Sequence, residues 1–208
     1  MLVDLSRVIE SGMPAYPGDP VAELTPAAAQ EPWRVTRLAL GSHSGTHVDA
    51  AAHFIPGGRT IDDYELERFV LDAVVVPVAA GRDAAIGWAA LRPALPGDVR
   101  GKAVLLHTGW DRHWRDEERE HHPYLSRDAC ERLVAAGVSL VGTDALNVDA
   151  TAGATIDAHE VLLGADVLIV ENLINLAALT PGRPCRCAFV PLRIDGGDGS
   201  PIRAYAWA

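Results

Sequence analysis

The chain has 208 residues, which is enough for one hydrophobic core or at most two small domains. Its formal net charge of −10 argues against binding to a nucleic-acid backbone, because such proteins need a concentrated basic surface. A hydrophobic fraction of 49% with 22% charged residues excludes wholesale disorder, and three cysteines are too few for a disulfide scaffold.

Short apolar runs rich in β-branched residues recur along the chain and have the length of strands. Several are almost continuously apolar, which is typical of strands that are buried on both faces. We predict strands at residues 2–9, 35–40, 71–78, 103–107, 138–143, 167–171 and 187–192.

Helical patterns lie between the strands of the second half. We predict helices at residues 84–91, 127–136 and 156–164, the first two preceded by Asp83 and Ser126, which are common N-cap residues. Strands that alternate with helices predict an α/β domain, and the strand-rich first half predicts a mixed sheet. There is no internal repeat or evident linker, so residues 1–208 are interpreted as one domain.

No segment has the character of a signal peptide or a membrane span. The longest apolar stretches, such as residues 73–80, are far shorter than the roughly 20 residues that cross a bilayer. We therefore expect a soluble, cytoplasmic protein with a small-molecule substrate and with neither membrane nor nucleic acid as a partner.

The densest cluster of possible metal ligands lies at residues 43–53, which read His-Ser-Gly-Thr-His-Val-Asp-Ala-Ala-Ala-His. On a helix, Asp49 would lie about 200° around the axis from His47, at about 100° per residue. An extended backbone would instead direct positions 43, 45, 47 and 49 to one side. Gly45 is a poor helix former and its neighbours are β-branched, so we predict an extended segment in which Gly45 leaves room for an ion.

Imidazole and carboxylate ligands together suit a divalent ion such as zinc or manganese. The alternative interpretation is that His43 and His47 are hydrogen-bonded groups beside a turn, while Asp49 caps a following helix. A cap explains Asp49 but leaves both histidines without a role, so the metal site is favoured.

A second group of candidate ligands lies far along the chain. His159 falls on the predicted helix 156–164, and Glu171 closes the apolar run 167–171. A carboxylate at the end of a buried strand is costly unless it is paired or coordinated. Taken alone, neither residue decides between a ligand and an ordinary polar group.

The frame His43-x-Gly-Thr-His47-x-Asp49-x-x-x-His53 resembles the signature of the cyclase family of metal-dependent hydrolases, which includes bacterial kynurenine formamidases (arylformamidases) and isatin hydrolases. Weaker matches follow in the family's order at residues 14–20, 108–111, 142–144, 157–159, 170–173 and 199–203. The resemblance implies a single compact α/β domain with a mixed, partly barrel-like β-sheet flanked by helices. It also implies a homodimer or a larger homo-oligomer.

The resemblance also assigns roles by position. His43, His47 and Asp49 match the ligands of a first metal ion. Asp49, His159 and Glu171 match those of a second, so that Asp49 bridges two divalent ions. Zinc is the expected metal, with manganese as the alternative.

His53 corresponds to the family's general acid–base residue, and Tyr16 lies where formamidases place an aromatic side chain against the substrate. The implied reaction is hydrolysis of an aryl formamide, with N-formyl-L-kynurenine giving kynurenine and formate as the lead case. In it a metal-bound hydroxide attacks the carbonyl, and His53 shuttles a proton to the leaving amine.

Two departures from the family pattern widen the substrate question. Ala51 stands where the family usually has proline, and Tyr16 stands where formamidases usually have tryptophan. Opening of a cyclic amide, as in isatin hydrolases, or a cyclase reaction therefore stays open.

Two other classes of function could use some of these residues. A non-haem iron oxygenase could use His47, Asp49 and His159 as two imidazoles and one carboxylate on a jelly-roll fold, but it leaves His43 and His53 unused. A non-catalytic metal-binding protein would bind metal and lose no activity when His53 is changed. Among the other histidines, His121 and His122 lie in the charged run 112–122, which predicts a solvated helix face.

Overall fold

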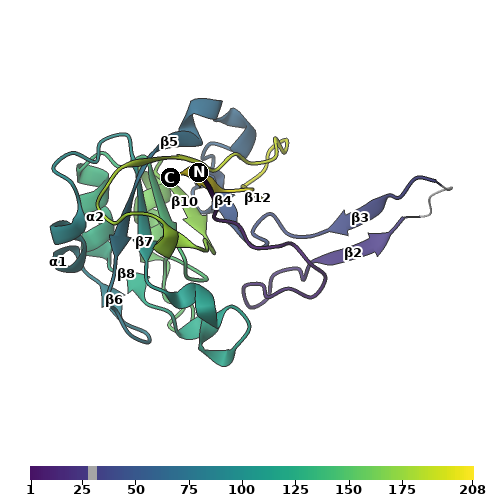
Figure 1. The fold of residues 1–208 in the computed structure, drawn as a ribbon, viewed down its shortest axis with the longest axis horizontal. Coiled ribbons are helices and arrows are strands. Elements are labelled where there is room, and N and C mark those ends of the chain that lie inside the picture. Colours follow the sequence, from purple (N-terminus) through teal and green to yellow (C-terminus); the bar gives the residue numbers. More distant parts are fainter. Residues whose placement is uncertain (28–31) are drawn as a thin grey trace.

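A nine-stranded mixed sheet forms the centre of the computed structural model, which describes residues 1–27 and 32–208 (Figure 1). The strand order is β1 (Leu2–Asp4), β13 (Tyr205–Trp207), β11 (Cys185–Ala188), β5 (Val70–Pro77), β7 (Ala103–His107), β9 (Leu140–Thr143), β10 (Leu168–Glu171), β4 (His47–Asp49) and β12 (Gly199–Pro201). Strands β5, β7, β9 and β10 are parallel, and the flanking pairs are antiparallel.

The sheet curls strongly. Strands β12 and β13 lie near opposite ends of the strand order, yet only residues 202–204 separate them in the chain. The four peptide steps of this connection span at most about 14 Å, so the two edges of the sheet must approach each other. Backbone hydrogen bonds from Ile202 N to Thr46 O (3.0 Å) and from Leu5 N to Ala204 O (2.9 Å) continue the pairing on both sides. The predicted mixed, partly barrel-like sheet is confirmed.

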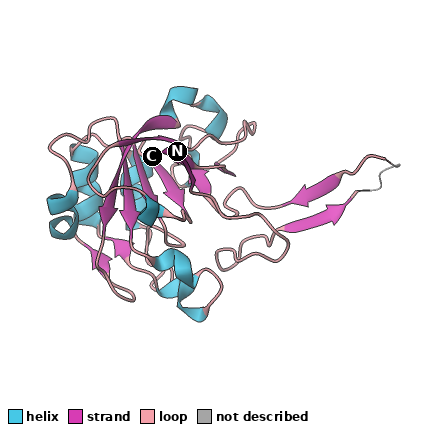
Figure 2. Ribbon diagram, viewed as in Figure 1, coloured by secondary structure: helices cyan, strands magenta, loops and turns pink. Residues whose placement is uncertain are grey.

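Alternate side chains of the central strands enter two separate cores. On β7, Leu105 joins the core enclosed by the curled sheet, and Leu106 joins the core under the helices. Helices α2 (Arg127–Ala135) and α3 (Asp157–Gly164) pack on this second core, together with the short α1 (Trp88–Leu91) (Figure 2). Such burial on both faces explains the continuous apolar runs of the sequence.

Smaller elements complete the chain. Strands β2 (Glu23–Pro26) and β3 (Thr36–Ala39) form a hairpin that projects from the body of the molecule (Figure 1). Strands β6 (Ala85–Ile86) and β8 (Tyr124–Leu125) form a short parallel pair. Single turns of 3₁₀ helix occur at Ala51–His53, Ile61–Asp63, Leu66–Arg68, Arg92–Ala94, Trp110–His113, Glu117–His121 and Leu176–Ala178.

Three of the predicted elements need correction. The strand at residues 2–9 ends at Asp4, whose carboxylate accepts a hydrogen bond from Ser6 N (3.2 Å) and turns the chain. The strand at 187–192 ends at Ala188, and Pro191 beyond it forms only an isolated bridge with Ile202. The helix at 84–91 is only four residues long and follows Gly87, since residues 85–86 pair with β8.

Other helix predictions hold. Helix α2 begins after Ser126, whose hydroxyl accepts a hydrogen bond from Ala129 N (3.3 Å), and α3 covers most of the predicted range. Among the described residues, no helix has both the length and the apolar character that are needed to cross a bilayer.

Candidate metal centre

Strand β4 carries two of the candidate ligands on one face. It pairs with β10 so that His47 lies opposite Glu171. Val48, between His47 and Asp49 in the strand, points into the enclosed core. His47, Asp49 and Glu171 therefore share the face of the sheet on which α3 packs. Helix α3 brings His159 to the same place.

The two oxygens of Asp49 face two different sets of side chains. Asp49 Oδ1 lies 2.7 Å from His43 Nδ1 and 3.3 Å from His47 Nε2. Asp49 Oδ2 lies 3.6 Å from His159 Nε2, which is itself 3.8 Å from Glu171 Oε1. Within each set the ligand atoms lie within 4.8 Å of one another. The structure thus brings together both of the sets that the resemblance implies.

The chain reaches His43 by a turn, so the prediction of an extended segment is wrong before His47. Gly45 has φ +64°, a left-handed conformation that favours glycine, and a Cβ there would lie 2.8 Å from Met13 Cε. The space beside Gly45 is filled by Met13 and is not left for an ion. Asp49 is not a helix cap either, because the N-cap of the following 3₁₀ turn is Ala50.

Burial makes this cluster an unusual place for charge. His47, Asp49, His159 and Glu171 are all at most 5% exposed. Among the described residues, the buried Asp49 Oδ2 has no hydrogen-bond partner. A buried carboxylate oxygen without a hydrogen-bond partner destabilises the fold unless a cation binds it. Each set offers imidazole nitrogens and carboxylate oxygens, which are ligands of zinc and manganese. The residues present therefore fit a divalent metal ion in each set.

Without metal, protons compensate the buried carboxylates. Burial lowers the pKa of His43, but its bonds to Asp49 and Asp198 outweigh this and raise it to about 9. Burial likewise lowers the pKa of His159, and Asp149 and Asp49 raise it to about 10. Burial, followed by the charge of Asp49, raises the pKa of Glu171 to about 7.

We expect metal affinity to rise with pH, because ligation requires neutral imidazoles. In the folded protein, the pKa values of His43 and His159 lie above the ordinary value for histidine. Their protonation therefore stabilises the metal-free protein fully below about pH 6.5, and this stabilisation is lost as pH rises through about 9 to 10. Each released proton gives about a tenfold gain in affinity per pH unit. Competition with a fluorescent chelator between about pH 6 and pH 8 measures this slope. An affinity independent of pH would contradict it.

Asp149 holds the ring of His159 and was not predicted from the sequence. Its Oδ2 accepts hydrogen bonds from His159 Nδ1 (2.8 Å) and His159 N (3.0 Å), and its Oδ1 accepts one from Ala158 N (2.8 Å). The carboxylate thus satisfies the first turn of α3 and directs Nε2 of His159 towards Asp49. No local pattern identifies it, since it precedes the helix by eight residues.

Asp149→Asn is expected to lower metal affinity about 10- to 100-fold, because the amide cannot fix the ring tautomer as the carboxylate does. Asp157→Asn is the matched control, since it removes an exposed carboxylate from the start of the same helix. Chelator competition compares the two variants. Equal affinities would show that Asp149 only caps the helix.

His53 belongs to neither of these two sets, but it forms a third group of possible ligands with His43 and Asp198. It closes the 3₁₀ turn after β4, its ring centroid is 3.9 Å from that of His43, and its Nδ1 is 3.4 Å from Asp198 Oδ2. Burial lowers the pKa of His53 despite the nearby Asp49, which favours the neutral ring. A neutral, half-buried imidazole at the edge of such a site is suited to accept and deliver a proton.

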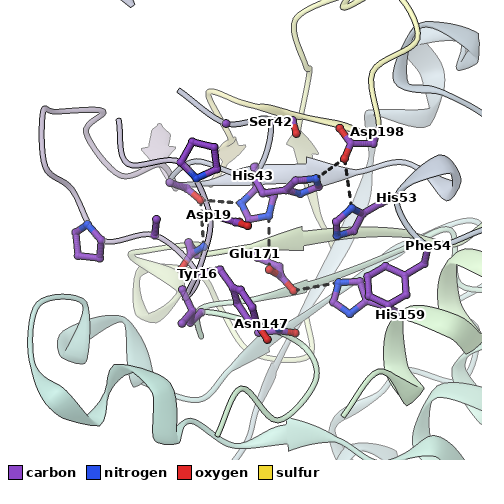
Figure 3. A pocket seen from close by; sticks show the side chains of 18 of the residues that line it. Tyr16, Asp19, Ser42, His43, His53, Phe54, Asn147, His159, Glu171 and Asp198 are labelled. Atoms are coloured by element: carbon purple, nitrogen blue, oxygen red, sulfur yellow. Dashed lines mark hydrogen bonds and ion pairs between the residues drawn. The ribbon is translucent and has the colours of Figure 1, made fainter. Parts of the chain in front are cut away.

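A cavity of about 410 Å³ opens onto this cluster (Figure 3). Tyr16 and Trp114 line it together with Phe54, which stacks on His159 at a centroid distance of 4.4 Å. The cavity has the size and the aromatic lining of a site for a small organic molecule. The predicted substrate contact Tyr16 is thus in the cavity.

The charged run 112–122 differs from its prediction. It forms two 3₁₀ turns rather than one solvated helix. His122 is only 1% exposed, and its Nε2 lies 2.8 Å from Thr151 Oγ1. The hydrogen bond to Thr151 explains how this histidine is tolerated inside the protein.

Residues 3–150, which include β4 and His53, match the family described as "Putative cyclase". The chain belongs to the cyclase family. The parallel central strands and the helices also exclude the jelly-roll fold that the oxygenase alternative required.

Relatives of this cyclase-family chain match it over nearly its full length. The kynurenine formamidase of Salinibacter ruber is 35% identical over 98% of this chain and 95% of its own. That of Paracidovorax citrulli is 33% identical over the same shares. An isatin hydrolase bound to the product analogue thioisatinate has a TM-score of 0.88 at 25% identity, covering 99% of this chain and 91% of that one. The prediction of a cyclase-family hydrolase is confirmed.

Proposed function

We propose that this protein is a metal-dependent amide hydrolase whose lead substrate is N-formyl-L-kynurenine. The observation that carries the proposal is Asp49, whose two buried oxygens face two sets of ligands while one of them lacks a hydrogen-bond partner. The kynurenine formamidases at 33–35% identity support the substrate class. Two divalent ions, zinc or alternatively manganese, fit the donor set.

The residues divide the work of hydrolysis. His43, His47 and Asp49 would hold one ion, and Asp49, His159 and Glu171 the other. Such ions supply acidification of a water molecule and polarisation of the substrate carbonyl. Hydrolysis forms a C–O bond and breaks the C–N bond, so the leaving nitrogen must gain a proton. His53 receives a proton from the attacking water and delivers it to that nitrogen.

Substrate binding falls to the aromatic side of the cavity. Tyr16 and Trp114 line the cavity and offer flat apolar surfaces for an aryl ring. Tyr16 is therefore the proposed substrate contact.

Metal analysis coupled to an assay tests the proposal. Purified protein should carry two ions per chain and release formate from N-formyl-L-kynurenine. Chelation should abolish the activity, and zinc or manganese should restore it. Fully active protein without metal would overturn the mechanism, and bound metal with no hydrolysis of any amide would leave the non-catalytic alternative.

Opening of a cyclic amide is the second candidate, favoured by the overlap with an isatin hydrolase at a TM-score of 0.88. The same protein is offered isatin in parallel. Hydrolysis of the lactam consumes one water and releases no formate, so the two reactions are distinguished by product. The ratio of kcat/KM values for the two substrates decides between them.

A homodimer is also proposed. On the projecting hairpin and beside it, Trp33, Val35 and Leu38 are 68%, 56% and 59% exposed. A two-stranded hairpin is marginally stable in water on its own, so a second copy of the chain is the proposed cover. Light scattering should give twice the chain mass, and Trp33→Glu should lower the measured mass towards that of one chain.

A cytoplasmic location remains a prediction, consistent with the free thiols of Cys130, Cys185 and Cys187.

A further inference from the structure

Asp198 lies between a candidate metal ligand and the candidate acid–base residue. Its Oδ2 is 3.0 Å from His43 Nε2 and 3.4 Å from His53 Nδ1 (Figure 3). One carboxylate oxygen therefore faces a ring nitrogen of each histidine. The remaining ring nitrogen of His43, Nδ1, faces Asp49.

The backbone holds Asp198 firmly in this place. Its carbonyl accepts a hydrogen bond from Ala50 N (2.9 Å), and the preceding carbonyl of Gly197 accepts one from Ile61 N (2.7 Å). The next residue is Gly199, where a Cβ would lie 2.8 Å from His43 Cε1. The ring of His43 thus packs directly on the backbone of the segment that presents the carboxylate.

The side chain of Asp198 retains some freedom to adjust. It is 45% exposed, so a small rotation of the side chain can shorten the 3.4 Å separation from His53. If Nδ1 of His53 carries the hydrogen, it can donate a hydrogen bond to Asp198 Oδ2. The Nε2 of His53 forms no hydrogen bond with any described residue, so in this tautomer it has a free lone pair.

We propose that Asp198 is a positioning residue that holds His53 in the Nδ1–H tautomer, so that Nε2 carries the proton to the leaving nitrogen. The inference rests on the proposed amide hydrolysis. Asp198 also accepts from His43 Nε2, as carboxylates commonly do behind a metal-bound histidine. The experiments must therefore separate an effect through His53 from an effect through His43.

Leaving-group dependence provides the first separation. With N-formyl-L-kynurenine, Asp198→Asn should lower kcat about 10- to 100-fold and leave KM within about threefold, because protonation of an amine is required. With 4-nitrophenyl formate, whose phenolate leaves without a proton, the loss should be about tenfold smaller, because only the removal of a proton from water then depends on His53. Asp195→Asn is the matched control, since Asp195 is an exposed carboxylate of the same loop. Equal losses on both substrates would overturn the proposal.

A double-mutant cycle provides the second separation. In a His53→Ala background, adding Asp198→Asn should change kcat by less than about twofold, because the two residues act as a unit. Metal content should equal that of wild type. Loss of an ion, or an undiminished effect without His53, would show that Asp198 acts through His43 instead.

A spectroscopic readout tests the inference independently of activity. In protein labelled with ¹⁵N-histidine, the signals that disappear in His53→Ala identify this ring. They should report the Nδ1–H tautomer in wild type and a shift towards Nε2–H in Asp198→Asn. An Nε2–H ring in wild type would overturn the inference even if no amide were hydrolysed. Failure of wild type to hydrolyse amides, with the expected tautomer, would overturn only the proposed function.

Discussion

Asp49→Asn is expected to remove both metal ions and to lower kcat/KM at least about 10³-fold. Each oxygen of this carboxylate faces a different ligand set, and the side chain is fully buried. Asparagine offers one neutral oxygen, and its NH₂ group would face an imidazole that must itself supply a lone pair. The two sets would therefore lose the anionic carboxylate that joins them.

Single-set variants provide the comparison for Asp49. His43→Ala and Glu171→Gln each alter a residue that belongs to only one of the two sets, so each should retain one ion per chain. Metal content after dialysis, measured by mass spectrometry, should rank wild type at two, these variants at one and Asp49→Asn at none. Two ions in Asp49→Asn would show that the carboxylate does not join the sets.

His53→Ala is expected to lower kcat for the formamide about 10²- to 10⁴-fold while metal content stays at the wild-type level. The ring lines the cavity, borders His43 and stands outside both ligand sets, so its removal deprives the leaving nitrogen of a proton donor without removing a ligand. Steady-state kinetics with metal analysis of the same sample measure both quantities.

Chemical rescue sharpens the prediction for His53. Added imidazole should restore part of the lost rate in His53→Ala, because the truncated side chain leaves space for the small base. His113→Ala serves as the control, since His113 pairs with Asp116 away from the cavity. A His53→Ala variant with its metal and the full rate would remove the proton-transfer role.

The central strands could be predicted from the sequence because each is a continuous apolar run. Strands β5, β7, β9 and β10 are covered on both faces, and that burial is written directly into their composition. Strands β12 and β13 were missed, because three residues such as Gly199–Pro201 carry no period. Their place in the sheet depends on partners far away in the chain.

The sequence predicted the site residues that belong to one compact motif or that its family resemblance assigns. Residues that support the ligands from elsewhere were missed. His43 and Asp198 are 155 residues apart, and their contact depends on β12 pairing with β4. Asp149 reaches His159 only through the folding of the loop before α3. Such contacts leave no local spacing to detect.

The position of β4 between β10 and β12 sets an order of events during synthesis. His47 and Asp49 leave the ribosome early, but the strands that flank them, Leu168–Glu171 and Gly199–Pro201, follow more than a hundred residues later. At about 5–20 residues per second, the interval from residue 49 to residue 201 is about 8–30 s. Throughout it the nascent chain exposes two histidines and a carboxylate without their flanking strands. We therefore predict that a metal ion would bind stably only after residue 201 has been translated.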